Sequence, residues 1–228
     1  MSDHTEELSI VITADNSKTL YNPRVGENYH SLHGAIEESN HVFLNSGLRY
    51  FLAGKEHQKV SVLEVGFGTG LNFLVTADFC TGTELPLRYV GVEAYPLDKK
   101  LLEATDYHQL VSENTWNAYI KTYESALKEK VMLNSFCEYN IAHTELKDFH
   151  SDEQFDIIYF DAFASRNQPE MWNFEAISHT VSFLKPGGVF VTYAITGNLK
   201  RIMKSLGLKI EKAPGSAGKR EMLRALKL

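Results

Sequence analysis

From residue 60 onward, short apolar runs alternate with stretches of helical spacing, and this alternation restricts the folds that the chain can adopt. The runs predict strands at 60–65, 87–93, 135–142, 155–163, 189–195, 208–213 and 220–227. The stretches between them predict helices at 71–79, 97–105, 112–129, 144–149, 169–184 and 198–206. Strands that alternate with helices favour a parallel sheet, because each helix returns the chain to the edge where the next strand starts. We therefore expect an α/β, Rossmann-like fold whose mostly parallel, seven-stranded sheet ends in an antiparallel C-terminal hairpin.

The first 55 residues follow a different pattern. LSIVIT (8–13) and VFL (42–44) predict two short strands. The segment between them contains Asn22, Pro23 and Gly26, which are typical of a loop. A chain of 228 residues is long enough for one substantial core and short for two. We therefore expect a small N-terminal extension, residues 1–55, that packs on the ligand site of one Rossmann-like domain, residues 56–228.

Cysteine content and the lack of long apolar runs indicate the cellular compartment in which the protein works. Cys80 and Cys137 both lie in apolar stretches, so we expect buried thiols in a reducing environment and neither a disulfide framework nor a metal cluster. No apolar run reaches the ~18 residues that a membrane span needs. The N-terminus is acidic and polar, unlike a signal peptide. These features predict a cytoplasmic protein without a membrane or metal partner.

A glycine-rich segment, LEVGFGTGLNF (63–73), lies between a predicted strand and a predicted helix. Glycines at such a turn let the backbone approach a ligand, and they leave the amides of the helix start available. The dinucleotide pattern G-x-G-x-x-G needs a glycine where this chain has Leu71, which disfavours a nicotinamide-dependent oxidoreductase. Gly66, Gly68 and Gly70 after the acidic Glu64 suit instead a ligand with an ammonium group, such as S-adenosylmethionine. An ordinary tight turn is the alternative.

Acidic residues end two further predicted strands. Glu93 ends LRYVGVE, where a carboxylate can accept hydrogen bonds from both hydroxyls of a ribose. Asp161 ends the apolar run IIYF, and an unpaired carboxylate is costly to bury. Because the carboxyl ends of parallel strands meet at one edge of a sheet, we expect Glu64, Glu93 and Asp161 to share a site. The alternatives are a surface glutamate at 93 and a helix cap at 161.

The charge is unevenly distributed along the chain. The segment from Gly197 to Leu228 contains nine Lys and Arg residues and two Glu, so its net charge is +7. Because the whole chain has a net charge of −6, the remaining residues together carry −13. Such asymmetry can mark a phosphate-binding face on an acidic protein, and a solvated surface is the alternative. Lys219 and Arg220, next to the loop of the predicted hairpin, are our candidates for nucleic-acid phosphate contacts.

The chain resembles the methyltransferase half of the tRNA 5-methylaminomethyl-2-thiouridine biosynthesis (MnmC) family, which has the class I S-adenosylmethionine-dependent methyltransferase fold. The resemblance covers roughly residues 8–226 and rests on LEVGFGTGLNFL, GVEAYPL, YFDAFASRNQPEMWN, LKPGGVFVTYAITGNLKR and PGSAGKREML, with the lead-in ENYHSLHGAIEESNHVFLNSG. The segments DAFA…PEMW and GKREM are the most diagnostic. Ser165 departs from the family pattern, in which we expect a proline, and this bears on the geometry of its loop.

This resemblance implies transfer of a methyl group from S-adenosylmethionine to the aminomethyl nitrogen at C5 of a tRNA wobble uridine. Longer family members also carry a flavin-dependent oxidase domain, for which this chain has no room. The expected substrate is therefore 5-aminomethyl-(2-thio)uridine. The open alternatives are a small-molecule amine methyltransferase or aminopropyl-type transferase, and a non-catalytic module that keeps the cofactor pocket.

The resemblance also assigns roles to residues. It implies that the methionine part of the cofactor lies against Glu64, Gly66, Gly68, Gly70 and Asn72, and its ribose against Glu93. Tyr29, His30 and Ser31 would close over the cofactor or the target amine. An aspartate and an alkylamine differ by ~6 pKa units, so we expect Asp161 to orient the amine rather than to remove its proton. Phe163 is expected to stack on the flipped base, whereas Trp172 either stacks or packs its helix against the sheet.

Overall fold

The computed structural model describes residues 7–54, 57–216, 218 and 220–228, and most of them surround one eight-stranded sheet. The strands lie in the order β10 (Leu208–Pro214), β11 (Glu221–Lys227), β9 (Leu184–Thr192), β8 (Phe155–Phe160), β4 (Val60–Val65), β5 (Leu87–Glu93), β7 (Cys137–His143) and β6 (Val131–Asn134). The central strands from β9 to β7 run parallel, and β11 and β10 form the antiparallel hairpin at one edge. The Rossmann-like α/β prediction is therefore confirmed.

The prediction of seven strands was wrong by one. All seven expected strands are present, and β6 adds an eighth, antiparallel to β7 at the other edge of the sheet. Leu133 is the one buried residue of β6, while Met132 is 54% exposed. A short edge strand with so little burial has no alternating apolar pattern by which the sequence could reveal it.

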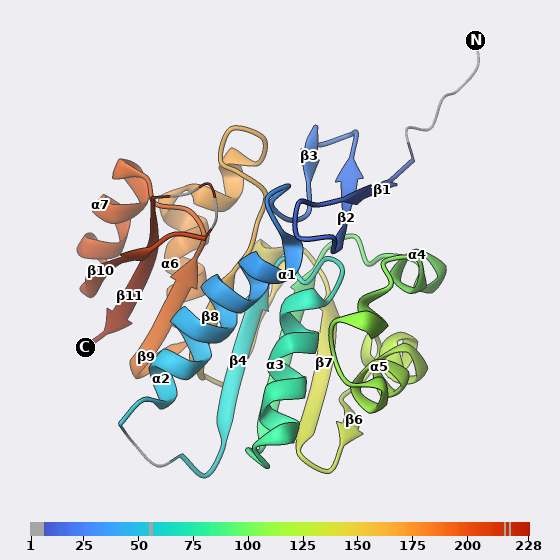
Figure 1. Ribbon diagram of the computed structural model, residues 1–228. Coiled ribbons are helices and arrows are strands. Elements are labelled where there is room, and N and C mark those ends of the chain that lie inside the picture. Colours follow the sequence, from blue (N-terminus) through green and yellow to red (C-terminus); the bar gives the residue numbers. More distant parts are fainter. Residues whose placement is uncertain (1–6, 55–56, 217, 219) are drawn as a thin grey trace.

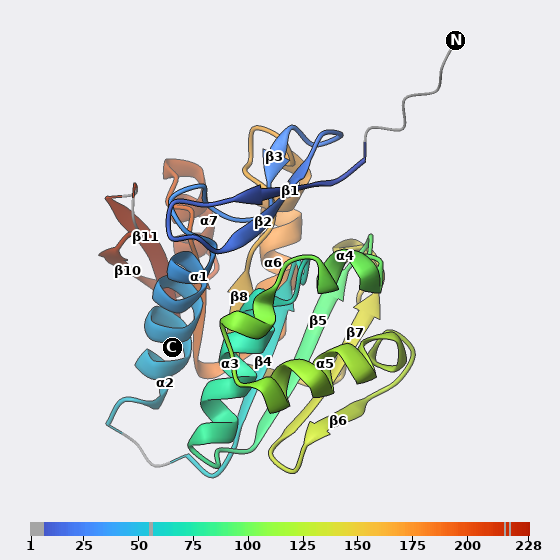
Figure 2. The ribbon, with the colours of Figure 1, turned by 45° about the vertical axis from the view of Figure 1, so that its right-hand side comes forward.

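Helices cover both faces of this sheet (Figures 1 and 2). One face carries α3 (Leu71–Gly82), α5 (Glu113–Ala126) and a long N-terminal helix, and the other carries α6 (Phe174–Ser182) and α7 (Gly197–Ser205). The shorter elements are α4 (Lys99–Glu103), η2 (Tyr107–Gln109), η3 (Leu146–Asp148) and η4 (Pro169–Trp172). Alternate residues of β4 point to opposite faces, so Val62 and Leu63 belong to two different apolar clusters. The central strands are thus buried on both sides, as a parallel sheet requires.

The N-terminal extension contains a second sheet and a helix. Strands β1 (Ser9–Ile12), β2 (Lys18–Asn22) and β3 (Glu27–Asn28) form an antiparallel sheet that lies above the carboxyl ends of the main strands (Figure 1). The strand predicted at 8–13 is therefore confirmed. The division of the chain at residues 55 and 56 stays a prediction.

The strand predicted at 42–44 was wrong, because those residues are helical. The elements α1 (Ala35–Glu38), η1 (Ser39–Arg49) and α2 (Tyr50–Leu52) form one continuous helix, with wide turns in its middle part. This helix lies against the sheet so closely that a Cβ on Gly47 would be 2.8 Å from the Tyr159 ring. Val42, Phe43 and Leu44 are all buried, since the helix packs on the sheet and on α3. An apolar run in a helix that is covered on several sides cannot be distinguished from a buried strand by its period.

Candidate active site

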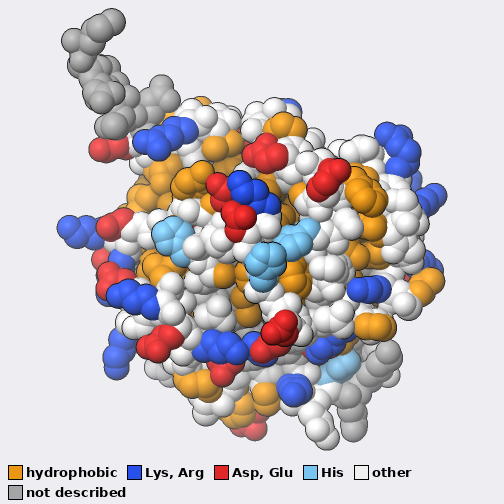
Figure 3. Space-filling model, turned by 180° about the vertical axis from the view of Figure 1, so that it is seen from behind, with side chains coloured by type: hydrophobic (Ala, Val, Ile, Leu, Met, Phe, Trp, Pro, Cys, Tyr) orange, Lys and Arg blue, Asp and Glu red, His pale blue; other side chains and the backbone are white. Residues whose placement is uncertain are grey.

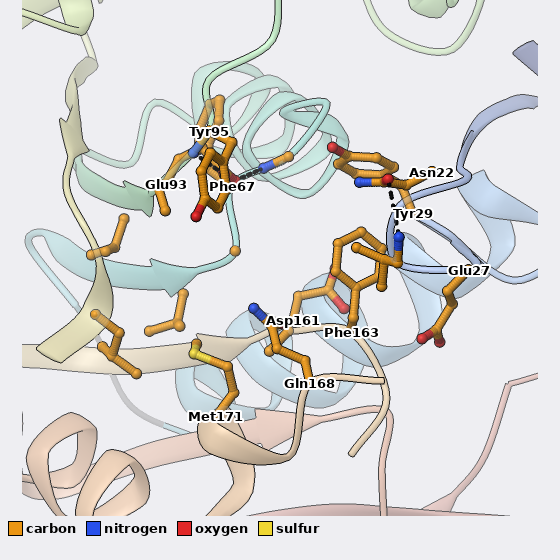
Figure 4. A pocket seen from close by; sticks show the side chains of 18 of the residues that line it. Asn22, Glu27, Tyr29, Phe67, Glu93, Tyr95, Asp161, Phe163, Gln168 and Met171 are labelled. Atoms are coloured by element: carbon orange, nitrogen blue, oxygen red, sulfur yellow. Dashed lines mark hydrogen bonds between the residues drawn. The ribbon is translucent and has the colours of Figure 1, made fainter. Parts of the chain in front are cut away.

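A cavity of ≈ 1680 Å³ opens where the main strands β4, β5 and β8 end and the N-terminal sheet begins. Figure 4 shows Glu93 and Tyr95 on one side of it and Tyr29, Phe163 and Asp161 on the other. Pockets for one small ligand usually measure about 300–1,000 Å³. This cavity therefore has room for a cofactor and for part of a second substrate. Its place, beside the central strand where the strand order reverses, is where open α/β sheets bind ligands.

The glycine-rich turn after β4 forms the floor of the cavity. Gly66 has φ +85°, and a Cβ there would lie 2.5 Å from the carbonyl oxygen of Asp161. Gly70 precedes α3 with φ +77°, and a Cβ there would lie 2.4 Å from the Tyr119 hydroxyl. Both positions require glycine, because the backbone is left-handed and its neighbours leave no space for a side chain. Gly66 and Gly68 line the cavity, whereas Gly70 lies behind the lining and faces Tyr119.

Glu93 lies at the tip of β5 and faces the cavity. Its Oε2 accepts a hydrogen bond of 2.8 Å from the Gly68 N–H, and its Oε1 accepts one of 2.9 Å from the Tyr95 N–H. Two backbone donors therefore fix the carboxylate against the glycine turn. Each carboxylate oxygen has a further lone pair, which is available to a hydroxyl donor in the cavity.

Asn72, in the first turn of α3, joins two carboxylates. Its Nδ2 donates to Glu64 Oε1 and to Asp161 Oδ2, both at 2.8 Å. In this orientation the amide nitrogen donates to both acidic side chains, which the amide oxygen, an acceptor only, could not do. The opposite atom, Asn72 Oδ1, is buried and has no hydrogen-bond partner among the described residues. Asn72 lines the cavity, so its oxygen is an acceptor suited to a ligand N–H group.

Glu64 lies beneath Asn72 and is fully buried. Its second oxygen accepts a hydrogen bond of 2.8 Å from the Tyr89 hydroxyl. Burial raises the pKa of Glu64 well above its ordinary value. The structure thus places Glu64 behind the wall of the cavity, where it orients Asn72, and not among the lining residues. A direct contact of Glu64 or Gly70 with a cofactor stays a prediction.

The three residues of the lead-in segment all line the cavity. The ring of Tyr29 meets that of Phe163 edge-on, with 5.2 Å between centroids, and burial, with the nearby charge of Glu93, raises the pKa of Tyr29 to about 12. His30 is 9% exposed, and burial lowers its pKa to about 4, so its ring is neutral near pH 7. Its Nδ1 lies 3.0 Å from Thr19 Oγ1. The Ser31 N–H donates to Glu38 Oε2 at 2.8 Å, which fixes the start of the segment that leads into α1.

The loop that follows β8 carries Asp161 and Phe163 into the cavity and is held at several points. Trp172 Nε1 donates to the Phe163 carbonyl at 2.7 Å, and the Tyr193 hydroxyl donates to the Ala162 carbonyl at 3.0 Å. Trp172 is 5% exposed, and its ring packs edge-on against Phe160. Of the two alternatives for Trp172, stacking on a base or packing against the sheet, the structure shows packing.

The sequence did not reveal two cavity-lining residues in β3, Glu27 and Asn28. The Oε2 of Glu27 accepts hydrogen bonds from the Ala164 N–H at 3.0 Å and from Asn167 Nδ2 at 2.7 Å. The Oδ1 of Asn28 is a second buried acceptor without a partner in the part of the chain that the structure describes. A strand of two residues has no periodicity, so only the lead-in motif around them could have indicated a role.

The basic tail forms several contacts within the protein. Arg224 pairs with Glu211 at 3.0 Å and lies 3.5 Å from the centre of the Tyr50 ring, and Lys227 Nζ donates to the Leu184 carbonyl at 2.7 Å. Figure 3 shows Lys and Arg side chains interspersed with Asp and Glu on the rear face rather than gathered together. Part of the basic tail is therefore engaged within the protein, and a phosphate-binding role for the rest of it stays a prediction. Arg220 is exposed near the loop after β8, and Lys219 lies outside the described residues.

Among residues 7–54, 57–216, 218 and 220–228, no cluster of three or more His, Cys, Asp or Glu could hold a metal ion. In the same ranges, no helix has the length and apolar character to span a membrane. Cys80 and Cys137 are buried free thiols, as expected.

Comparison with known proteins agrees with this fold. A family model described as S-adenosyl-L-methionine-dependent methyltransferase matches residues 103–228. The bifunctional tRNA 5-methylaminomethyl-2-thiouridine biosynthesis protein MnmC of Magnetococcus marinus is 29% identical over 92% of this chain, and that of Burkholderia multivorans is 28% identical over 90%. The chain covers 33% of each of these relatives, about a third of their length. The crystal structure of MNMC2 from Aquifex aeolicus aligns with a TM-score of 0.78 at 23% identity, over 98% of this chain and 71% of that one, and so shares the fold.

Proposed function

Because this chain belongs to the S-adenosyl-L-methionine-dependent methyltransferase family, we propose that it methylates the 5-aminomethyl nitrogen of a (2-thio)uridine at the tRNA wobble position. The name of the MnmC relatives supports this choice of substrate. Those relatives are about three times as long as the part that this chain matches, and the proposal assigns the methyl transfer to that shared part. The proposal includes a cytoplasmic location, where such a tRNA would be met.

The cavity fits the cofactor at three points. S-adenosylmethionine supplies an electrophilic methyl group on its sulfonium sulfur. The unpaired Asn72 Oδ1 suits the ammonium group of its methionine part, and the glycine turn leaves room for the chain of that part beside Gly66 and Gly68. Glu93, fixed by two backbone donors, retains acceptor capacity for the ribose hydroxyls.

The substrate amine must present its lone pair to the methyl group. Asp161 faces the cavity, and the Asn72 amide holds its Oδ2, so the carboxylate is fixed in one orientation (Figure 4). In this position it can accept a hydrogen bond from the amine and set the direction of the lone pair. Phe163 and Tyr29, which meet edge-on beside Asp161, offer apolar surface for the uracil ring.

One observation carries the proposal. The Asn72 amide links the cavity-facing Asp161 to a fully buried acidic side chain, and its Oδ1 is a buried acceptor with no partner among the described residues. A single side chain therefore relates the position of the cofactor ammonium to that of the substrate amine. Aligning two reactants in this way is the main task of a methyltransferase, and alignment can contribute ~7–11 kcal/mol to lowering a barrier.

The test is methyl transfer in vitro, followed by nucleoside mass spectrometry. The protein is incubated with isotope-labelled S-adenosylmethionine and tRNA that contains 5-aminomethyl-2-thiouridine, and labelled 5-methylaminomethyl-2-thiouridine is the expected product. Asp161→Asn should lower turnover on the order of 10²-fold, with little change in cofactor affinity, because only the alignment of the amine is lost. Methylation of small amines but not of tRNA would contradict the proposal, as would cofactor binding without any transfer.

A further inference from the structure

A second, shallower hollow of ≈ 430 Å³ lies next to the candidate active site. Its lining includes Ala164, Trp172, Tyr193, Ile195, Thr196 and Arg220. Ala164 and Tyr193 also line the large cavity. The two hollows are therefore neighbours that share one wall, which the loop after β8 and the end of β9 form.

Hydrogen bonds hold this shared wall from both sides. From the end of β9, the Tyr193 hydroxyl donates to the Ala162 carbonyl at 3.0 Å. From the N-terminal sheet, Glu27 accepts the Ala164 N–H at 3.0 Å. Two elements that are distant in sequence thus hold the wall between the two hollows.

The chemistry of the second hollow differs from that of the first. Its floor is largely apolar, from the half-buried Tyr193 and Ile195 and the small exposed part of Trp172, and the exposed Arg220 also lines the hollow. The Thr196 side chain already accepts the Leu199 N–H at 3.1 Å as the N-cap of α7, so it serves the helix. The acidic residue that lines this hollow, Glu221, is paired with Lys212 at 3.3 Å, which lowers its repulsion of an anion. Apolar and aromatic surface next to a guanidinium is the combination that binds a nucleobase together with its phosphate.

We propose that the second hollow binds the nucleotide adjacent to the target uridine in the same RNA strand, with its base on the apolar floor and its phosphate at Arg220. This inference rests on the proposed function and adds a substrate requirement to it. Consecutive nucleotides are joined by one phosphodiester, so their bases need two sites that lie side by side. Enzymes that take a base out of its stack commonly contact its flanking nucleotides as well.

The experiment compares two substrates that differ only in the adjacent nucleotides. The isolated nucleoside 5-aminomethyluridine occupies the large cavity alone, whereas a trinucleotide with that residue in its centre also supplies both neighbours. Arg220→Gln removes the cation of the hollow, and Ala194→Phe fills its space. Lys121→Gln is the matched control, because it removes one positive charge from an exposed position on α5, away from both hollows.

We expect Arg220→Gln and Ala194→Phe each to raise the KM for the trinucleotide about five- to tenfold, and to leave the KM for the nucleoside within about twofold. The slope of log affinity against log salt concentration for the trinucleotide should decrease by about 1 in Arg220→Gln, because one ionic contact is lost, and should remain unchanged in Lys121→Gln. Equal effects on both substrates, or no effect on either, would overturn the inference. A melting temperature equal to that of the wild type excludes misfolding as the cause.

Failure of the proposed function gives a different result. If no uridine substrate is methylated, fluorescence anisotropy with a labelled trinucleotide still tests the hollow, since binding does not require transfer. Weaker binding by Arg220→Gln than by Lys121→Gln then supports the nucleotide site, and equal binding by the two variants rejects it.

Discussion

The carboxylate of Glu27, in the short strand β3, accepts a hydrogen bond of 3.0 Å from the backbone N–H of Ala164 in the loop after β8. The two residues are 137 positions apart in the sequence. The same carboxylate oxygen accepts Asn167 Nδ2 at 2.7 Å. The N-terminal sheet therefore fixes the loop that carries Asp161 and Phe163, although it belongs to a different layer of the structure.

Removing this contact should weaken substrate binding more than cofactor binding. Hydrogen bonds to a charged group contribute about 1.5–3 kcal/mol, so Glu27→Ala should raise the KM for the RNA substrate roughly tenfold or more. Glu27→Gln keeps an acceptor oxygen and should recover most of the loss. Steady-state kinetics and titration with S-adenosylmethionine measure the two effects. A parallel loss of cofactor affinity and thermal stability in both variants would show that Glu27 only supports the fold.

A side chain at Gly66 should destabilise the protein strongly. A side chain at Gly207, which also has a left-handed backbone conformation, should lower the free energy of unfolding only moderately. Gly207 has φ +79° and open space around a Cβ, so Gly207→Ala should lower the free energy of unfolding by about 1–2 kcal/mol, the cost of a left-handed alanine. Gly66→Ala adds a contact of 2.5 Å with the Asp161 carbonyl, so it should destabilise the protein further and displace Asp161. Denaturant unfolding and methyl transfer by both variants test this, and equal loss of stability would contradict it.

Sequence patterns indicated the residues of this site that lie at strand ends. Glu93 and Asp161 follow apolar runs, and parallel strands bring their ends to one edge whatever the details of packing. The glycine turn was equally visible, because its conformation depends on its own residues.

Contacts that depend on the tertiary arrangement had no such local signal. The Glu27–Ala164 hydrogen bond joins two layers, and the unpaired Asn28 oxygen depends on how the N-terminal sheet covers the cavity. Glu64 was expected beside the ligand; it lies near the carboxyl end of the doubly covered strand β4, where Asn72 and Tyr89 donate to its two oxygens, and a direct contact with a ligand stays a prediction. The face on which a strand residue lies can be predicted from its period, whereas its depth below a cavity depends on the neighbouring side chains.

His30 should make the protein less stable in mild acid. Its pKa is about 4 in the folded protein and near 6.5 when unfolded, so between these values only the unfolded chain binds the proton. The free energy of unfolding should therefore fall as the pH drops from about 6.5 to about 4, by roughly 3 kcal/mol in total. The His30→Gln variant should lack this fall in the unfolding free energy, whereas a variant at an exposed histidine, His143→Gln, should still show it. Urea unfolding at several pH values measures the difference, and identical pH profiles of wild type and His30→Gln would contradict the prediction.

Glu64 should make the protein less stable as the pH rises, which is opposite to the effect of His30. Burial raises its pKa well above the ordinary 4.5, so above that value the unfolded chain releases a proton that the folded protein retains. The stability that Glu64 contributes is therefore present at low pH and is lost as the pH rises toward the folded pKa. Glu64→Gln removes the ionisation and keeps an oxygen that can accept from Asn72, while the Tyr89 hydroxyl can turn to accept from the new amide. The unfolding free energy of Glu64→Gln relative to wild type should rise as the pH increases above about 4.5, whereas Glu124→Gln, an exposed change on α5, should show no trend. If the difference between Glu64→Gln and wild type does not change with pH, Glu64 binds its proton equally in the folded and unfolded states, and this would contradict a raised pKa.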